Sequence, residues 1–270
     1  MSAPTNIFNQ LPSSASSRGN QIKWYSDGYF YKQDLLGYEG LSEVLAYRLA
    51  IQTNLTKYGV TQYELVKHHG KICCRSKSYN PNNHEEQSLL KLLTRYYSTD
   101  LDGVYKQYFE TCDTLTESFY DFVRMTVLQA VGFDIKDWLA LILRFDWLIL
   151  NEDRHFRNLA FIKQKFNFIP APIFDNGAGF LSDMITYPSD CNISDAINGL
   201  QAKPFSSSFV QQVNLVEEYA TETLQFTSNT VKLKVSDLAE FYSKHIINRV
   251  CNILEAQLKR MYPHITLIWS

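Results

Sequence analysis

The chain has 270 residues, of which 45% are hydrophobic and 20% charged, and its formal net charge is −2. This composition is typical of a soluble globular protein with one large domain or two lobes, and it gives no general attraction to nucleic acid or anionic membranes. Neither the polar segment 1–20 nor the run 138–150, which Arg144 and Asp146 interrupt, fits a secretory signal or a membrane span. The five cysteines are odd in number and form no CxxC pair, which favours free thiols in a reducing compartment such as the cytoplasm.

The first 80 residues are predicted to form antiparallel strands and one helix. Two pairs of strand-like segments flank turn signals: 21–26 and 29–33 around Asp27-Gly28, and 62–67 and 71–76 around His68-His69-Gly70. Between these pairs, apolar residues recur at helical spacing from about residue 40 to 54. The segment 13–20 is small and polar and is predicted to be a loop.

The rest of the chain is predicted to be mainly helical, with a short hairpin formed by 159–162 and 166–169. The expected helices are 85–97, 115–131, 135–150, 209–224 and 235–261. The helix 135–150 is apolar on nearly every side and should be buried. These patterns predict an α+β, bilobal, protein-kinase-like fold: a small β-rich N-lobe (1–80), a connector near 77–83, an α-helical C-lobe (81–270), and a nucleotide between them.

The sharpest chemical signal is Asn151-Glu152-Asp153-Arg154-His155-Phe156-Arg157-Asn158, followed by Asp175-Asn176-Gly177. An Asp and an Asn five residues apart, with a later Asp, is the set that phosphoryl transfer requires. Asp153 is predicted to orient the attacking hydroxyl and accept its proton. Asn158 and Asp175 are predicted to hold magnesium on the nucleotide phosphates, and Gly177 to permit a sharp turn after Asp175.

A strand lysine positioned by a helix glutamate is the second part of such an apparatus. Lys32 lies on the second predicted strand and Glu43 on the following helix, and Lys23 with Glu39 is the alternative pair. Ser16, Ser17 and Gly19 lie where a kinase has its phosphate-covering loop, although GxGxxG is not satisfied and a plain linker remains an equal alternative. The serines of this loop are candidate autophosphorylation sites.

Other residues are assigned to the nucleotide site by position. Ser76, Lys77 and Ser78 are expected to offer backbone contacts to adenine, because they lead into the predicted connector. His155 is expected to pack beneath the Asp153 loop and to hydrogen-bond a backbone group. Arg154 and Arg157 are expected either to neutralise phosphate charge or to be solvated surface residues.

With these residues in place, the chain resembles the HipA-like serine/threonine kinases, which have a protein-kinase-like and phosphoinositide-kinase-like fold. The matching segments are Asn151-x-Asp153-x-His155-x-x-Asn158, Ala171-Pro172-Ile173-Phe174-Asp175, and Ser42-Glu43 after Lys32. Within that family it is most similar to the compact, cell-translocating kinases of Helicobacter. The resemblance implies a bacterial enzyme that uses ATP and Mg²⁺, phosphorylates Ser/Thr of a protein and often itself, with Lys32, Glu43, Asp153, Asn158 and Asp175 in the roles given above.

The chain also departs from the family pattern. It lacks the extra N-terminal subdomain of the full-length toxins, Arg157 replaces a common Lys, and Leu150 stands where Gly is usual. Two kinds of partner are therefore left open, an antitoxin and a host protein. A host-protein partner would require non-classical export of the chain as an effector.

Three other functions compete with this one. The Asp153-Arg154-His155-x-x-Asn158 motif also fits a phosphoinositide kinase, but residues 176–202 contain no Lys or Arg to bind a charged headgroup. A small-molecule kinase usually has His-Gly-Asp before its catalytic site, and here that run is absent. A nucleotide-binding interaction module without catalysis is the third alternative.

Overall fold

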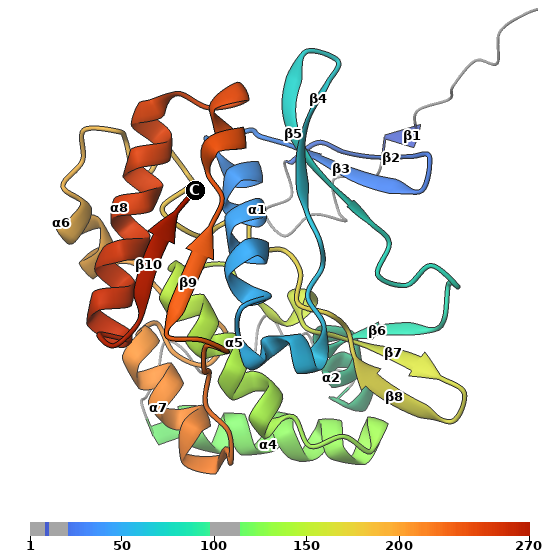
Figure 1. Cartoon of the computed structure of the whole chain (residues 1–270). Coiled ribbons are helices and arrows are strands. Elements are labelled where there is room, and N and C mark those ends of the chain that lie inside the picture. The colour runs from blue at the N-terminus through green and yellow to red at the C-terminus, as the bar shows by residue number, and fades with distance from the viewer. Residues whose placement is uncertain (1–8, 11–20, 98–113) are drawn as a thin grey trace, which may run out of the picture.

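The computed structural model describes residues 9–10, 21–97 and 114–270 (Figure 1). Its first part is a five-stranded antiparallel sheet with the strand order β1-β2-β3-β5-β4. The strands are β1 (Asn9–Gln10), β2 (Lys23–Ser26), β3 (Tyr29–Gln33), β4 (Glu64–His68) and β5 (Lys71–Lys77). Helix α1 (Glu39–Ala50) follows β3 and packs on this sheet, so the predicted arrangement of strands and one helix is confirmed.

Both predicted hairpins form with two-residue turns. Asp27 and Gly28 have φ angles of 52° and 81°, and His69 and Gly70 have φ angles of 49° and 72°. Positive φ at both central residues is the turn geometry that matches the twist of paired strands. The first hairpin sets Lys32 opposite Lys23 on β2 and opposite Cys74 on β5.

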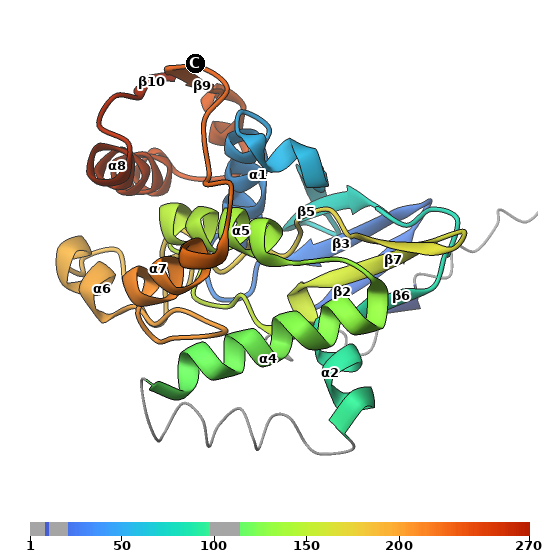
Figure 2. The same cartoon turned by 90° about the horizontal axis from the view of Figure 1, so that it is seen from below.

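The remainder of the chain is mainly helical, and it also contains a three-stranded sheet of order β6-β7-β8. Helix α5 packs against α7 and α8 and is buried on nearly all sides, as its sequence predicts (Figure 2). The elements are η2 (Asn54–Tyr58), β6 (Glu86–Ser88), α2 (Leu89–Tyr97), α4 (Thr114–Val131), α5 (Lys136–Ile149), η3 (Phe156–Asn158), β7 (Ala160–Gln164), β8 (Asn167–Pro170), α6 (Ile193–Gly199), α7 (Phe209–Tyr219), β9 (Thr230–Leu233), η4 (Ser236–Glu240), α8 (Lys244–Met261) and β10 (Thr266–Trp269).

Four expected helices have different bounds. Those expected at about 40–54 and 209–224 end earlier, at Ala50 and Tyr219, and the other two differ through pairing and capping. The expected helix 85–97 begins only at Leu89, because residues 86–88 pair with β7 as strand β6 and bury Gln87 against it. The expected helix 235–261 is divided into η4 and α8, since the hydroxyl of Ser243 accepts from the backbone N–H of Ile246 and caps a new helix. Tertiary pairing and capping outweigh helical periodicity in both places.

Helix α1 is held by the C-terminal part of the chain as well as by the sheet. Two backbone N–H groups in its first turn donate to side chains. The N–H of Gly40 donates to Asp34 at 2.7 Å, and the N–H of Leu41 donates to the Tyr242 hydroxyl at 3.1 Å. The Tyr242 hydroxyl in turn donates to Asp34 at 2.5 Å. Further along the helix, Arg48 forms two hydrogen bonds to Asp237 at 3.0 and 2.7 Å.

Strand β9 pairs in parallel with β10, and this small sheet packs beside α1. The boundary between the lobes near residue 80 stays a prediction. None of the helices in residues 21–97 and 114–270 is both long enough and apolar enough to cross a bilayer.

Candidate active site

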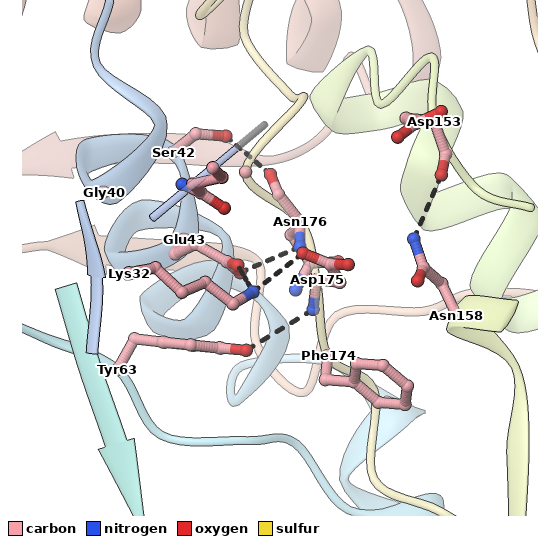
Figure 3. A network of polar contacts seen from close by, with 12 residues as sticks. Lys32, Gly40, Ser42, Glu43, Tyr63, Asp153, Asn158, Phe174, Asp175 and Asn176 are labelled. Atoms are coloured by element: carbon pink, nitrogen blue, oxygen red, sulfur yellow. Dashed lines mark hydrogen bonds and ion pairs between the residues drawn. The ribbon is translucent and has the colours of Figure 1, made fainter. Parts of the chain in front are cut away.

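A buried ion-pair cluster joins three residues that are far apart in sequence (Figure 3). The ammonium of Lys32, on β3, lies 2.6 Å from Oε1 of Glu43 on α1. It also lies 2.7 Å from Oδ1 of Asp175, which follows β8. The structure therefore brings the predicted lysine, helix glutamate and metal-binding aspartate into direct contact.

The charges of this cluster depend on one another. Burial lowers the pKa of Lys32, but the carboxylates of Asp175 and Glu43 outweigh it and hold that pKa well above its usual value. Burial raises the pKa of Asp175, but the charges of Lys32 and Lys23 reverse this, so Asp175 is ionised with a pKa below its ordinary value. At neutral pH the site therefore presents a charged carboxylate next to a charged lysine.

The backbone around Asp175 is fixed by several hydrogen bonds. Asp175 has a φ of 59°, and its N–H faces the Tyr63 hydroxyl at 3.4 Å. The next N–H, of Asn176, donates to Oε2 of Glu43 at 2.8 Å, and the carbonyl of Asn176 accepts from the Ser42 hydroxyl at 2.7 Å. Glu43 therefore holds both the lysine and the chain that carries Asp175.

The predicted turn after Asp175 forms, since the N–H of Gly179 donates to the carbonyl of Asn176 at 3.1 Å across Gly177 and Ala178. Gly177 does not have positive φ, whereas Asp175 and the later Phe180 and Leu181 do. The glycine that the structure requires is Gly179, because a Cβ there would lie 2.9 Å from Oγ of Ser42 and 3.1 Å from the carbonyl oxygen of Ile149. Close packing of this loop against α1 and the end of α5, rather than the turn itself, demands a glycine.

The loop that carries Asp153 starts at the end of the buried helix α5. Leu150 caps the helix with a φ of 58°, the conformation that favours the glycine usual at this place, while its side chain is buried. Asn151 then accepts from the N–H of Asp153 at 3.3 Å. The amide nitrogen of Asn158 donates to the backbone oxygen of Asp153 at 3.2 Å, which connects the two ends of the loop (Figure 3).

Arg154 is neither a phosphate ligand nor a solvated residue, because its side chain is 0% exposed. The guanidinium forms two hydrogen bonds to Asp146 of α5, at 2.9 and 3.0 Å. It also donates to the backbone oxygen of Phe174 at 2.7 Å, to Oδ1 of Asn176 at 2.6 Å and to the backbone oxygen of Asn158 at 3.4 Å. Arg154 therefore joins the Asp153 loop to the segment that carries Asp175.

His155 differs from its expected role. Neither of its ring nitrogens has a hydrogen-bond partner among the described residues, so the expected bond to a backbone group is not present. Burial lowers the pKa of His155, although the nearby carboxylates of Asp153 and Asp175 oppose this. The ring is therefore neutral at physiological pH.

The segment leading into the connector lines a cavity of about 500 Å³, together with residues from β3, β4 and the chain before β4. Ser76, Lys77 and Ser78 are all part of its lining. Lys77 pairs with Tyr29 in the sheet, so its side chain lies on the face opposite to Lys32. On the Asp175 side of this segment, Tyr79 stacks on Phe174 with ring centroids 5.2 Å apart.

The remaining predicted residues fall into two groups. The alternative pair of Lys23 and Glu39 is wrong, because the Glu39 carboxylate accepts from the backbone N–H groups of Leu36 at 2.8 Å and Gly37 at 3.0 Å. Ser16, Ser17, Gly19 and the other serines of that loop lie outside the described residues.

Two residues near the site were not predicted. Tyr63 borders the Lys32 ammonium, whose nitrogen lies 5.3 Å from the centre of its ring. The ammonium of Lys203 lies 2.8 Å from Oδ1 of Asp153. A signal for Lys203 was present in the sequence, since it is the only Lys or Arg between Lys165 and Lys232.

No protein-family model and no curated protein sequence matches the chain. Among solved structures, the chain is similar to the Helicobacter pylori proinflammatory kinase CtkA, with a TM-score of 0.52 and 15% identity over 96% of this chain and 95% of that one. A second similar structure is HipA of Shewanella oneidensis, determined with HipB and its operator DNA. Its TM-score is 0.48 and its identity 13%, over 96% of this chain and 67% of that chain.

The similarity to CtkA shows the fold. The chain has a kinase-like fold with a small β-sheet region and a helical part, as predicted. At the level of the fold, the predicted similarity to a compact Helicobacter kinase is confirmed.

Proposed function

We propose that this protein is a protein kinase that transfers the γ-phosphoryl group of ATP to Ser or Thr of a protein, with Mg²⁺, and that it also phosphorylates itself. The observation that carries this proposal is the contact of Lys32 with both Glu43 and Asp175, at 2.6 and 2.7 Å. Such a lysine, fixed by a helix glutamate beside a metal-binding aspartate, is the charge arrangement that holds nucleotide phosphates in kinases.

In this mechanism Asp153 accepts a hydrogen bond from the acceptor hydroxyl and orients its oxygen towards the γ-phosphorus. As the new O–P bond forms and the bond to the leaving ADP oxygen breaks, the hydroxyl proton passes to the Asp153 carboxylate. Lys32 stabilises negative charge on the nucleotide phosphates. Arg154 keeps the two loops in register, because it is bonded to both.

The donor set fits a magnesium site that is completed by phosphate oxygens. Among the described residues Oδ2 of Asp175 makes no hydrogen bond, since Lys32 uses Oδ1, and Asn158 uses its amide nitrogen, which leaves its oxygen for a cation. Within residues 21–97 and 114–270 no three His, Cys, Asp or Glu side chains gather into a metal site of their own. Mg²⁺ commonly binds to one or two protein oxygens plus phosphates and water, and when bound it would neutralise charge on the transferred group.

We assign the adenine to the region where Ser76–Ser78 meet the stacked rings of Tyr79 and Phe174. The rings pack against a small buried apolar cluster of Ala160, Ile162 and Ala171, and the stacked rings would offer a flat apolar face to a purine. Backbone groups of 76–78 would supply its polar contacts.

A protein acceptor is favoured over a phosphoinositide, because the loop after Asp175 contains Asp183, Asp190 and Asp195 and no basic residue before Lys203. The two alternatives to a protein kinase are a small-molecule kinase and a nucleotide-binding module without catalysis. An antitoxin and a host protein both stay open as the candidate partner.

The test is transfer of labelled phosphate from Mg·ATP by the wild type and by Asp153→Ala, with Asp190→Ala as the control for loss of a carboxylate on an exposed loop. We expect Asp153→Ala to lose transfer while it still binds ATP in a thermal-shift assay, and Asp190→Ala to keep transfer. Mass mapping of the wild type would then locate any phosphate on the serines of residues 13–17. Full activity of Asp153→Ala would refute the assignment, and a wild type that binds ATP without transfer would favour the interaction module.

A further inference from the structure

Lys203 is in direct contact with the proposed catalytic carboxylate. Its ammonium forms an ion pair with Asp153 at 2.8 Å, and the two side chains are 44% and 8% exposed, respectively. An ammonium group has three N–H donors, and Asp153 Oδ1 takes only one of them. The Lys203 head group is therefore bound at one side and open at another, directly beside the place where the phosphoryl group must be transferred.

The backbone that carries Lys203 is well anchored. The N–H of Ala202 donates to the carbonyl of Ser207 at 2.8 Å, and the N–H of Phe205 donates to Gln212 of α7 at 2.9 Å. The ring of Phe205 packs against Phe156 in the Asp153 loop, with centroids 5.7 Å apart. Because the two segments pack directly on each other, the ion pair is part of a fixed arrangement and not a chance encounter of surface chains.

The arginine next to the proposed base in the chain uses its donors elsewhere. Arg154 is buried and uses its donors on Asp146, Phe174, Asn176 and Asn158. A phosphoryl group in transfer nevertheless carries charge on its three equatorial oxygens, and a fixed cation at that point lowers the barrier.

We propose that Lys203 is a catalytic residue that donates to the γ-phosphoryl group while it remains bonded to Asp153. This inference rests on the proposed kinase function. One ammonium would thus hold the general base and the transferred group at a set separation. In the transition state Lys203 neutralises the charge of the equatorial oxygens, and Asp153 receives the proton of the acceptor hydroxyl.

The chain offers a closely matched control. Lys163 is 45% exposed and lies 3.1 Å from Glu85, so it resembles Lys203 in exposure and pairing but lies on β7, outside the proposed site. Lys203→Met and Lys163→Met are therefore compared in the same assays, and Lys203→Arg keeps the charge where the methionine variant removes it.

The first measurement is the rate of phosphate transfer from Mg·ATP to the chain itself and to dephosphorylated casein. Loss of a single stabilising charge costs on the order of 100-fold in kcat. We expect this loss for Lys203→Met with little change in KM for ATP, and no loss for Lys163→Met. Ethylammonium added to Lys203→Ala should restore part of the rate, which a purely structural lysine would not permit.

The second measurement needs no turnover. Calorimetry with Mg²⁺ compares the affinities for ADP and for AMP-PNP, which differ by the γ-group. We expect the preference for AMP-PNP to fall about tenfold in Lys203→Met, as for loss of a charge-assisted hydrogen bond, and to persist in Lys203→Arg and Lys163→Met.

Several results would overturn the inference. An unchanged AMP-PNP preference in Lys203→Met would mean that Lys203 only positions Asp153. A raised KM for casein with unchanged kcat would make it an acceptor-binding residue. Wild-type kcat in Lys203→Met, in a protein whose Asp153→Ala variant is inactive, would reject the role of Lys203 alone. By contrast, a wild type without any transfer would reject the proposed function itself.

Discussion

Replacing Arg154 with methionine should destabilise the protein far more than an ordinary loss of an ion pair. Arg154 and Asp146 are both 0% exposed, and the guanidinium also binds three acceptors in the two loops of the site. In Arg154→Met, Asp146 would remain as a buried charge whose carboxylate keeps only the amide of Asn151, at 2.8 Å. Breaking a buried pair in this way costs about 3–5 kcal/mol.

The magnitude can be checked by urea unfolding followed by circular dichroism, with a double-mutant cycle. In Asp146→Asn with Arg154→Met the stranded charge is gone, so the double variant should be more stable than the sum of the two single losses predicts, by about 2 kcal/mol or more. Arg48→Met is the control, since the Arg48 and Asp237 side chains are 22% and 39% exposed. Its expected cost is at most about 1 kcal/mol.

Two results would refute this reasoning. Equal losses in Arg154→Met and Arg48→Met would mean that burial does not control the cost. Strict additivity of the Asp146 and Arg154 substitutions would mean that the two side chains do not depend on each other. In addition, Arg154→Met should lower transfer activity even at temperatures where it is folded, because the Asp153 loop and the Asp175 segment lose their common support.

Two further predictions concern pH and packing. Burial raises the pKa of Asp34 to about 7, so the folded state retains a proton that the unfolded state loses above about pH 4. The free energy of unfolding should therefore fall as pH rises from 4 to 7, by at most about 4 kcal/mol. In urea titrations, Asp34→Asn should remove this pH dependence. The hydrogen bond to Arg124 lowers the pKa of Asp134, so Asp134 makes the protein more stable, not less, as pH rises. Asp134→Asn is the matched control, and it should leave the pH dependence due to Asp34 unchanged. Gly179→Ala should cost about 1–3 kcal/mol and reduce activity, because the new methyl group would lie 2.9 Å from Oγ of Ser42, whereas Gly199→Ala meets no atom within 4 Å and should be neutral in thermal melts. A Gly179→Ala variant as stable as the wild type would show that the loop can move away.

Local signals in the sequence were sufficient for much of the fold. The Asp27-Gly28 and His69-Gly70 turns and the apolar helix α5 follow from residue type and spacing. As predicted, Lys32 lies on a strand and Asp153 on the loop after a buried helix. The strands that the sequence did not predict depend on partners that are distant in the chain. Strand β6 forms only because β7 pairs with it, and β9 and β10, 36 residues apart at their last positions, stabilise each other.

In the candidate site, too, local sequence signals predicted some features, and contacts between distant residues were missed. Lys32, Glu43 and Asp175 were identified from spacing, and the structure brings them into contact. The role of Arg154 was missed because burial cannot be seen in one short loop, and Lys203 was missed because its partner lies 50 positions earlier in the chain. The pairing of Glu39 with backbone N–H groups is also a matter of geometry that no spacing rule contains.

The attachment of α1 to the C-terminal part of the chain affects how such an enzyme can be controlled. Protein kinases commonly gain and lose activity when the helix that carries the glutamate moves away from the lysine. Here that helix is bonded to Tyr242 at its start and to Asp237 further along, so an outward swing would break both contacts together. These contacts favour a Lys32–Glu43 pair that stays in place, and in the proposed kinase, control that leaves this helix where it is would act through access of substrate or nucleotide.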